Sequence, residues 1–196
     1  MAFTIELKGK VVLVTGVSSG IGLGVAREFA RAGADVAGCS RKIIGDESVV
    51  TFQQAVEQEG ARALYVQTDV TKKQDLEKLV RKVIEAFGRL DILVSNAGMN
   101  VFEGTELCSE DRWSYNLDLN LASHWRLAQL CKPYLAQTGE GVILLMTSNH
   151  AFCTIPGCFP YNVTKTAITG LVQSLAIEWG PEIRTVGVAP GFIDTA

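Results

Sequence analysis

Tyr161 and Lys165 are the side chains in this sequence whose types and spacing most directly suggest chemistry. Residues four apart share one face of an α-helix, so the phenol and the ammonium are expected to project in the same direction. An ammonium beside a phenol lowers the pKa of the tyrosine from about 10, as a general acid/base requires. An exposed pair on an amphipathic helix would show the same pattern, so the prediction depends on the residues that accompany it.

Short apolar runs alternate with longer helical patterns along the sequence, and together they predict the strands and helices that position these residues. Strands are expected at 11–14, 35–40, 63–67, 91–95, 142–147 and 184–189, and helices at 20–32, 47–59, 72–87, 109–134 and 161–179. Continuous Val/Ile/Leu strands and repeated βα units predict an α/β fold, a doubly wound, Rossmann-like parallel sheet with helices on both faces. We expect one domain, 1–196, with its ligand at the carboxyl ends of the strands.

A glycine-rich segment, 16–22, joins the first predicted strand to the first predicted helix. Glycines allow a tight turn and bring backbone N–H groups against a pyrophosphate, while the helix N-terminus adds its positive end. The spacing is G-x-x-x-G-x-G, and a glycine-rich turn without a ligand is the alternative. The predicted phosphate contacts are Gly16, Ser18, Ser19, Gly20, Ile21 and Gly22.

The second predicted strand ends in Ser40, Arg41 and Lys42. A carboxylate at this point accepts a hydrogen bond from the ribose 2′-hydroxyl of NAD, whereas an arginine accommodates the 2′-phosphate of NADP. Two cations without a carboxylate favour NADP(H) as the cofactor and leave NAD(H) possible. Two solvated surface cations are the alternative interpretation.

Small and polar residues also follow the third and fourth predicted strands. Asp69, followed by Val70, places a carboxylate within reach of an adenine amino group, or serves as the N-cap of the next helix. The segment after the fourth predicted strand consists of Asn96, Ala97 and Gly98. It either contacts the cofactor or forms a plain turn.

Taken in order, these motifs resemble the short-chain dehydrogenase/reductase (SDR) family, whose pattern also matches Asn120, Ser148 and the pair Pro190-Gly191. The resemblance implies that Tyr161 is the acid/base and that Lys165 lowers its pKa and binds the nicotinamide ribose. It implies that Ser148 polarises the substrate oxygen and that Asn120 holds a water in a proton relay. Further cofactor contacts are implied for Pro190, Gly191, Ile193 and Thr195, with Thr195 at the nicotinamide carboxamide.

The resulting functional prediction is an oxidoreductase that transfers a hydride between NADP(H) and a small carbonyl or secondary alcohol. An NAD-linked sugar or polyol dehydrogenase is the alternative, because Asn149 and His150 offer hydrogen bonds to a hydroxylated substrate. His150 satisfies a local backbone group in the competing interpretation, and His124 is expected to serve packing or an interface rather than chemistry. A catalytically silent nucleotide-binding scaffold would lack part of the Asn120, Ser148, Tyr161 and Lys165 set.

Composition excludes several other classes. A net charge of −3 provides no basic stripe for nucleic acid, and no apolar run reaches the length of a membrane span. Five cysteines without a C-x-x-C pair and two histidines without ligand spacing predict reduced thiols, a cytoplasmic location and no structural metal. The family resemblance implies a homodimer or homotetramer built on helices 109–134 and 161–179.

The largest departure from the family pattern is at Ala196, where the sequence ends. Family members continue through a substrate-covering helical segment and a seventh strand. We therefore expect a missing C-terminal part rather than a naturally short relative. The last strand is then expected to be an exposed, apolar edge, which favours pairing with another chain.

Overall fold

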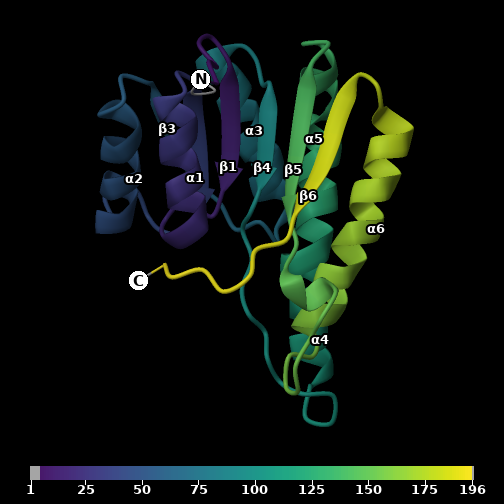
Figure 1. Cartoon of the computed structure of the whole chain (residues 1–196). Helices are drawn as coiled ribbons and strands as arrows, with labels where there is room; N and C mark the ends of the chain where they lie inside the picture. Colours follow the sequence, from purple (N-terminus) through teal and green to yellow (C-terminus); the bar gives the residue numbers. More distant parts are fainter. Residues whose placement is uncertain (1–4, 196) are drawn as a thin grey trace, which may run out of the picture.

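The computed structural model describes residues 5–195, which form a single six-stranded sheet flanked by helices (Figure 1). The strands are β1 (Val11–Thr15), β2 (Asp35–Ser40), β3 (Ala63–Gln67), β4 (Ile92–Ser95), β5 (Gly141–Met146) and β6 (Ile183–Val188). They pair in parallel in the order β3-β2-β1-β4-β5-β6. The chain runs outward from β1 to β3 and then returns to the other side of β1, so the switch point lies between β1 and β4.

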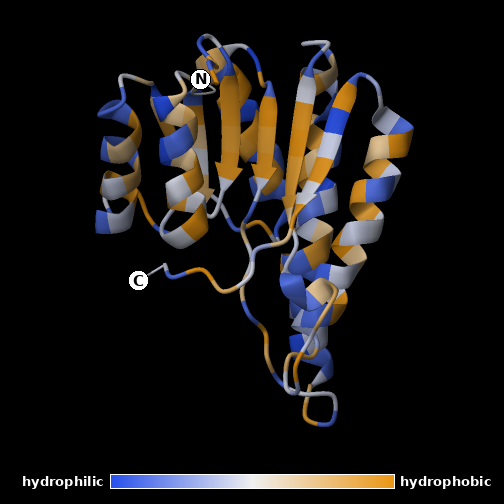
Figure 2. Cartoon of the chain, in the orientation of Figure 1, coloured by the Kyte–Doolittle hydropathy of each residue, from blue (hydrophilic) through white to orange (hydrophobic). Residues whose placement is uncertain are grey.

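Helices cover both faces of this sheet, as predicted. They are α1 (Gly20–Arg31), α2 (Glu47–Glu57), α3 (Lys73–Phe87), α4 (Glu110–Leu117), α5 (Ser123–Ala136) and α6 (Tyr161–Trp179). One hydrophobic core packs α1 and α2 against the sheet, and the other packs α3, α5 and α6 against its opposite face. Burial on both faces explains the four apolar residues that begin β1. The edge strand β6 is mixed in hydropathy and is not the apolar edge that was expected (Figure 2).

The predicted helix over 109–134 is not continuous. A π-helical turn, η1 (Asp118–Ala122), separates α4 from α5. Such turns insert one extra residue into a helix and are frequent at functional sites. Asn120 lies inside this turn, with its side chain fully buried.

An ion cluster fixes the amino ends of β1 and β4, opposite the carboxyl ends where the ligand is expected. The carboxylate of Asp91 is buried and accepts from the Val11 N–H at 2.9 Å and from the Arg89 guanidinium at 2.8 and 2.6 Å. The Lys10 ammonium lies 3.5 Å away. Burial opposes ionisation of Asp91, but these partners outweigh it and hold the pKa of its carboxyl below the usual range.

Neither a membrane-spanning helix nor a metal-binding cluster is present among residues 5–195. None of the helices combines the length and apolarity needed to cross a membrane. No group of three or more His, Cys, Asp or Glu side chains in this range is arranged to hold a metal ion.

Candidate active site

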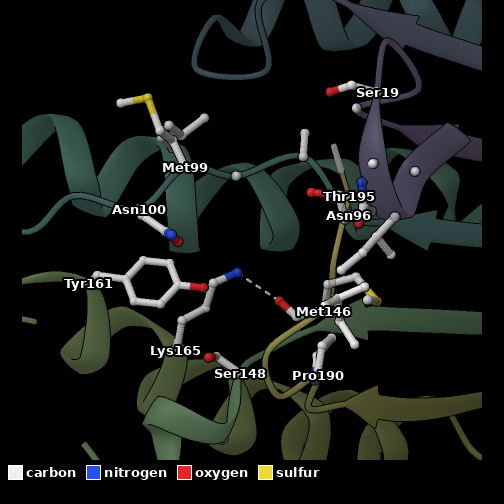
Figure 3. A pocket seen from close by; sticks show the side chains of 18 of the residues that line it. Ser19, Asn96, Met99, Asn100, Met146, Ser148, Tyr161, Lys165, Pro190 and Thr195 are labelled. Atoms are coloured by element: carbon white, nitrogen blue, oxygen red, sulfur yellow. Dashed lines mark hydrogen bonds between the residues drawn. The ribbon is translucent and has the colours of Figure 1, made fainter. Parts of the chain in front are cut away.

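A cleft of about 990 Å³ opens at the carboxyl ends of the strands, a volume large enough for a cofactor-sized ligand (Figure 3). Three of the four predicted catalytic residues line it: Ser148, Tyr161 and Lys165. Every predicted cofactor contact also lines it: Gly16, Ser18, Ser19, Gly20, Ile21, Gly22, Ser40, Arg41, Asp69, Val70, Asn96, Ala97, Gly98, Pro190, Gly191, Ile193 and Thr195. The sheet therefore gathers these residues, from distant parts of the sequence, around one space.

The hydroxyl of Thr15, the last residue of β1, holds the switch point together. It accepts from the backbone N–H groups of Asn96 and Ala97 at 2.9 and 2.8 Å, beyond the end of β4. The Asn96 side-chain amide donates to the Thr15 carbonyl at 2.8 Å. Sequence reasoning did not assign Thr15 a role, although its place directly before Gly16 was visible.

The glycine loop is packed so closely that side chains would not fit. Gly16 and Gly20 have φ of +78° and +56°, in the left-handed region that favours glycine. A Cβ on Gly22 would collide with the carbonyl oxygen of Gly16. The N-cap of α1, Ser19, makes no side-chain capping bond, and the first turn of α1 contains no acidic residue. The N-terminus of α1 is therefore an uncompensated positive end, which fits the pyrophosphate of a dinucleotide.

The two cationic side chains after β2, Arg41 and Lys42, differ in their contacts with the rest of the protein. The Lys42 ammonium lies 3.3 Å from the Asp46 carboxylate, an ion pair at the start of α2. The exposed guanidinium of Arg41 lines the cleft and has no ion pair or hydrogen bond with residues 5–195. Arg41 is therefore the cation at this corner that is available to a ligand.

Asp69 is not the N-cap of α3, because that position belongs to Lys72. Its Oδ1 instead accepts from the N–H and the hydroxyl of Thr71 at 3.1 and 2.7 Å. No partner of its Oδ2 is found among the described residues, and Asp69 lines the cleft.

Tyr161 is the first residue of α6, and its side chain lies at the cleft together with Ser148 (Figure 3). Burial raises the pKa of Tyr161, and the opposing effect of the nearby Ser148 hydroxyl is smaller. The expected lowering by Lys165 is therefore not found. The reason is the direction of the ammonium: Nζ donates to the Met146 carbonyl at 2.8 Å and lies 5.5 Å from the centroid of the Tyr161 ring.

Lys165 itself is buried, with only 3% of its surface exposed. Desolvation of the ammonium lowers the pKa of Lys165 to about 8. Its helix position is held by the Thr147 hydroxyl, which donates to the Lys165 carbonyl at 2.6 Å.

Ser148 begins a short 3₁₀-helix, η2 (Asn149–Ala151). Its Oγ accepts from the His150 N–H at 3.2 Å and donates to the Asn149 Oδ1 at 3.3 Å. The His150 ring lies edge-on to Tyr161 and Phe102, with centroid distances of 6.2 and 6.1 Å. His150 therefore forms part of the cleft wall beside the tyrosine, and the hydroxyl of Thr154 lies 3.4 Å from its Nδ1.

Asn120 lies behind the cleft wall rather than in it. Its Oδ1 accepts from the Met99 N–H at 3.0 Å, and its Nδ2 donates to the Met99 carbonyl and to the Asn116 Oδ1, both at 2.9 Å. Asn116 in turn donates to the Pro160 carbonyl at 3.0 Å, directly before Tyr161. Asn116 was not predicted as a site residue, although its spacing of four from Asn120 on one predicted helix was a usable signal.

His124 is fully buried at the start of α5, in agreement with the expected packing role. Its Nδ1 lies 2.7 Å from the Ser95 hydroxyl at the end of β4, and its Nε2 has no partner among the described residues. Desolvation, together with the nearby Lys165 charge, lowers the pKa of His124 to about 3. The imidazole is therefore neutral at physiological pH.

The segment after β6 crosses below the carboxyl ends of the strands toward α1 (Figure 1). The Pro190 carbonyl accepts from the Asn149 N–H at 3.0 Å. Thr195 lies against the glycine loop, because a Cβ on Gly20 would be 3.2 Å from its Cβ. This segment links the loop after Ser148 to the phosphate loop.

Comparison with known proteins identifies the family. The family model described as short chain dehydrogenase matches residues 10–196. The chain belongs to the short-chain dehydrogenase/reductase family. It is 39% identical over 193 residues to human "Dehydrogenase/reductase SDR family member 4", an alignment that covers 97% of this chain and 68% of the human protein. It is 37% identical over 195 residues to the 2-dehydro-3-deoxy-D-gluconate 5-dehydrogenase of Bacillus subtilis, covering 97% and 74%.

Solved structures of SDR-like proteins share the fold. An alcohol dehydrogenase from Thermococcus sibiricus, complexed with 5-hydroxy-NADP, matches with a TM-score of 0.87 and 33% identity, covering 94% of this chain and 77% of that one. Carveol dehydrogenase from Mycobacterium avium, in complex with NAD, matches with a TM-score of 0.89 and 28% identity, covering 95% and 72%. This SDR chain is an NAD(P)-dependent oxidoreductase that acts on CH–OH groups.

Proposed function

We propose that this SDR chain transfers a hydride between NADP(H) and a small carbonyl or secondary alcohol, with Tyr161 as the acid/base. The observation that carries the proposal is that Ser148, Tyr161 and Lys165 line the same cleft as the glycine loop. A cofactor on that loop and a substrate at the tyrosine would share one space. Their reacting atoms would therefore meet without a rearrangement of the fold.

The cofactor supplies the hydride when it is bound, and the chain supplies position and proton chemistry. Ser148 donates a hydrogen bond to the substrate oxygen and polarises its bond to carbon. Tyr161 donates a proton to that oxygen in reduction and removes it in oxidation. The raised pKa of Tyr161 keeps the phenol protonated at neutral pH, which suits donation to a carbonyl.

Lys165 and Asn120 are proposed to connect this site to bulk water. The two side chains flank Gly98, where an added Cβ would be 2.7 Å from Asn120 Oδ1 and 3.6 Å from Lys165 Nζ. The Asn120 Oδ1 and the Lys165 Nζ therefore lie on the same side of Gly98, and this proximity supports the proposed water link between them. A lysine with a pKa of about 8 exchanges protons readily near neutral pH.

The proposed preference for NADP(H) rests on Arg41, which directly follows β2. Arg41 is exposed and lines the cleft, and its guanidinium has no partner among residues 5–195, as a 2′-phosphate site requires. The glycine loop and the N-terminus of α1 would hold the pyrophosphate, and the Asp69 Oδ2 would face the adenine amino group. NADP in one structural neighbour and NAD in another leave the choice to experiment.

A hydroxylated substrate, such as a sugar or polyol, is the second candidate. Asn100, Asn149 and His150 line the cleft near Tyr161 and offer hydrogen bonds beyond the reacting oxygen. The name of the B. subtilis relative, a 2-dehydro-3-deoxy-D-gluconate 5-dehydrogenase, agrees with such a substrate. A panel of simple ketones and keto sugar acids, followed at the nicotinamide absorbance, separates the two candidates.

The test of the mechanism is Tyr161→Phe. Loss of the proton donor should lower kcat by at least about 100-fold while the Kd for NADPH changes by less than about threefold. Turnover is measured by the nicotinamide absorbance and binding by tryptophan fluorescence. Tyr134→Phe, which removes a phenol in α5 outside the cleft, is the matched control. Turnover that is the same in Tyr161→Phe and the wild type would refute the assignment.

A further inference from the structure

A tyrosine on β3 lies against the segment that carries Arg41. The Tyr65 hydroxyl is 2.8 Å from the Ser40 hydroxyl and 2.7 Å from the Lys42 carbonyl. The Lys42 N–H donates to the Ser40 Oγ at 3.2 Å. These three residues bracket Arg41, the proposed ligand of the 2′-phosphate.

The single proton on each hydroxyl group determines which group donates in each of these hydrogen bonds. The phenol has a single proton, and the Lys42 carbonyl is its nearest acceptor, at 2.7 Å against 3.1 Å for the Ser40 carbonyl. The Ser40 hydroxyl must then donate to the phenol oxygen. The result is a closed ring in which Lys42 N–H donates to Ser40, Ser40 donates to Tyr65, and Tyr65 donates back to Lys42.

This ring holds the backbone of residues 40–42 in one conformation. The Gln67 side-chain amide adds a bond to the Arg41 carbonyl at 3.2 Å, also from β3. The Tyr65 side chain is nearly buried, and this burial raises the pKa of its phenol, so the donor is present at neutral pH. The guanidinium of Arg41, in contrast, has no hydrogen bond or ion pair with residues 5–195.

The hydroxyl of Ser40 already donates a hydrogen bond within the same ring. Its proton goes to Tyr65, so it is not available for donation to a phosphate oxygen. The proposed recognition of the 2′-phosphate therefore depends on Arg41 and on the conformation of its backbone.

We propose that Tyr65 is a positioning residue for the cofactor 2′-phosphate and acts through the conformation of the segment that carries Arg41. A segment that is ordered before binding loses less conformational freedom when a ligand binds. The benefit is confined to NADPH, because NADH has no phosphate at this corner. This inference rests on the proposed preference for NADP(H).

The test is Tyr65→Phe, which removes the ring of hydrogen bonds and keeps the aromatic packing against Phe52. The dissociation constants of NADPH and NADH are measured separately by tryptophan fluorescence in the absence of substrate. We expect the Kd for NADPH to rise by about five- to tenfold and the Kd for NADH by less than about twofold. Ser40→Ala breaks the same ring and should give the same pattern.

A double-mutant cycle with Arg41→Ala separates positioning from other effects. If Tyr65 acts through Arg41, Tyr65→Phe should have almost no effect on the Kd for NADPH in the Arg41→Ala background. Tyr134→Phe is the control for loss of a phenol elsewhere, because its hydroxyl has no hydrogen bond with residues 5–195.

Failure of the cofactor proposal and failure of the Tyr65 role give different results. A wild-type chain that binds NADH more tightly than NADPH overturns the cofactor proposal and this inference with it. A wild-type preference for NADPH that is unchanged in Tyr65→Phe, or an equal weakening of both cofactors, overturns only the role of Tyr65.

Discussion

The buried histidine of α5 should make this protein sensitive to acid. His124 has no exposed surface, and its pKa of about 3 in the folded chain compares with about 6.5 in the unfolded chain. Between these two values the unfolded chain binds a proton that the folded chain does not. Folding stability is therefore complete above about pH 6.5 and falls as the pH is lowered towards 3.

The size of the effect follows from the two pKa values. Each pH unit in this window removes about 1.4 kcal/mol from the free energy of unfolding. Between about pH 7 and pH 4.5, His124 should therefore cost about 2.5 kcal/mol. That is a large fraction of the ~5–15 kcal/mol by which domains are stable.

The assay is urea unfolding of the wild type and of His124→Gln at several values between pH 7 and 4.5. Carboxylates contribute equally to both chains, so the difference between their pH slopes isolates His124. The wild type should lose about 2.5 kcal/mol more than the variant over this range. Parallel slopes in the wild type and His124→Gln would refute the reasoning.

Two other substitutions test the cofactor corner and the opposite end of the sheet. Arg41→Ala should raise the Kd for NADPH by at least about tenfold and that for NADH by less than about twofold, because only NADPH carries the 2′-phosphate; equal losses in a fluorescence titration would contradict this. Asp91→Ala should lower the free energy of unfolding by about 2 kcal/mol, because it leaves the buried Val11 N–H without its acceptor; a loss below about 0.5 kcal/mol in urea would contradict it.

The framework and most of the cleft were predictable from sequence because they depend on local patterns. Strand β2 was predicted residue for residue, since Asp35–Ser40 is a short run bounded by turn residues. The glycine loop was predictable because strand, loop and helix follow one another directly. The cleft residues after the first four strands followed from the carboxyl ends of those strands, whereas the roles of Ser148, Pro190 and Thr195 came from the resemblance to the SDR family.

Side-chain partners across the fold could not be predicted in this way. Ser95 and His124 are 29 positions apart, and Ser40 and Tyr65 are 25 apart, so neither pair appears in any local spacing. The four-residue spacing correctly put Lys165 near the Tyr161 ring, but the Met146 carbonyl at the end of β5 determines where the ammonium points. The direction of the Tyr161 pKa was wrong for the same reason.

The π-helical turn η1 takes up one extra residue without changing the rotational phase of the helix that follows it. Each residue of a regular α-helix turns the chain by about 100°, so an extra residue inserted there without a wider turn would rotate α5 by about that angle. His124, Leu127 and Cys131, which face the core from α5, would then turn away from it. The wider turn therefore gives Asn120 its place and keeps the packing of the next helix. A single deletion within 118–122 should disturb Asn120 far more than the core contacts of α5.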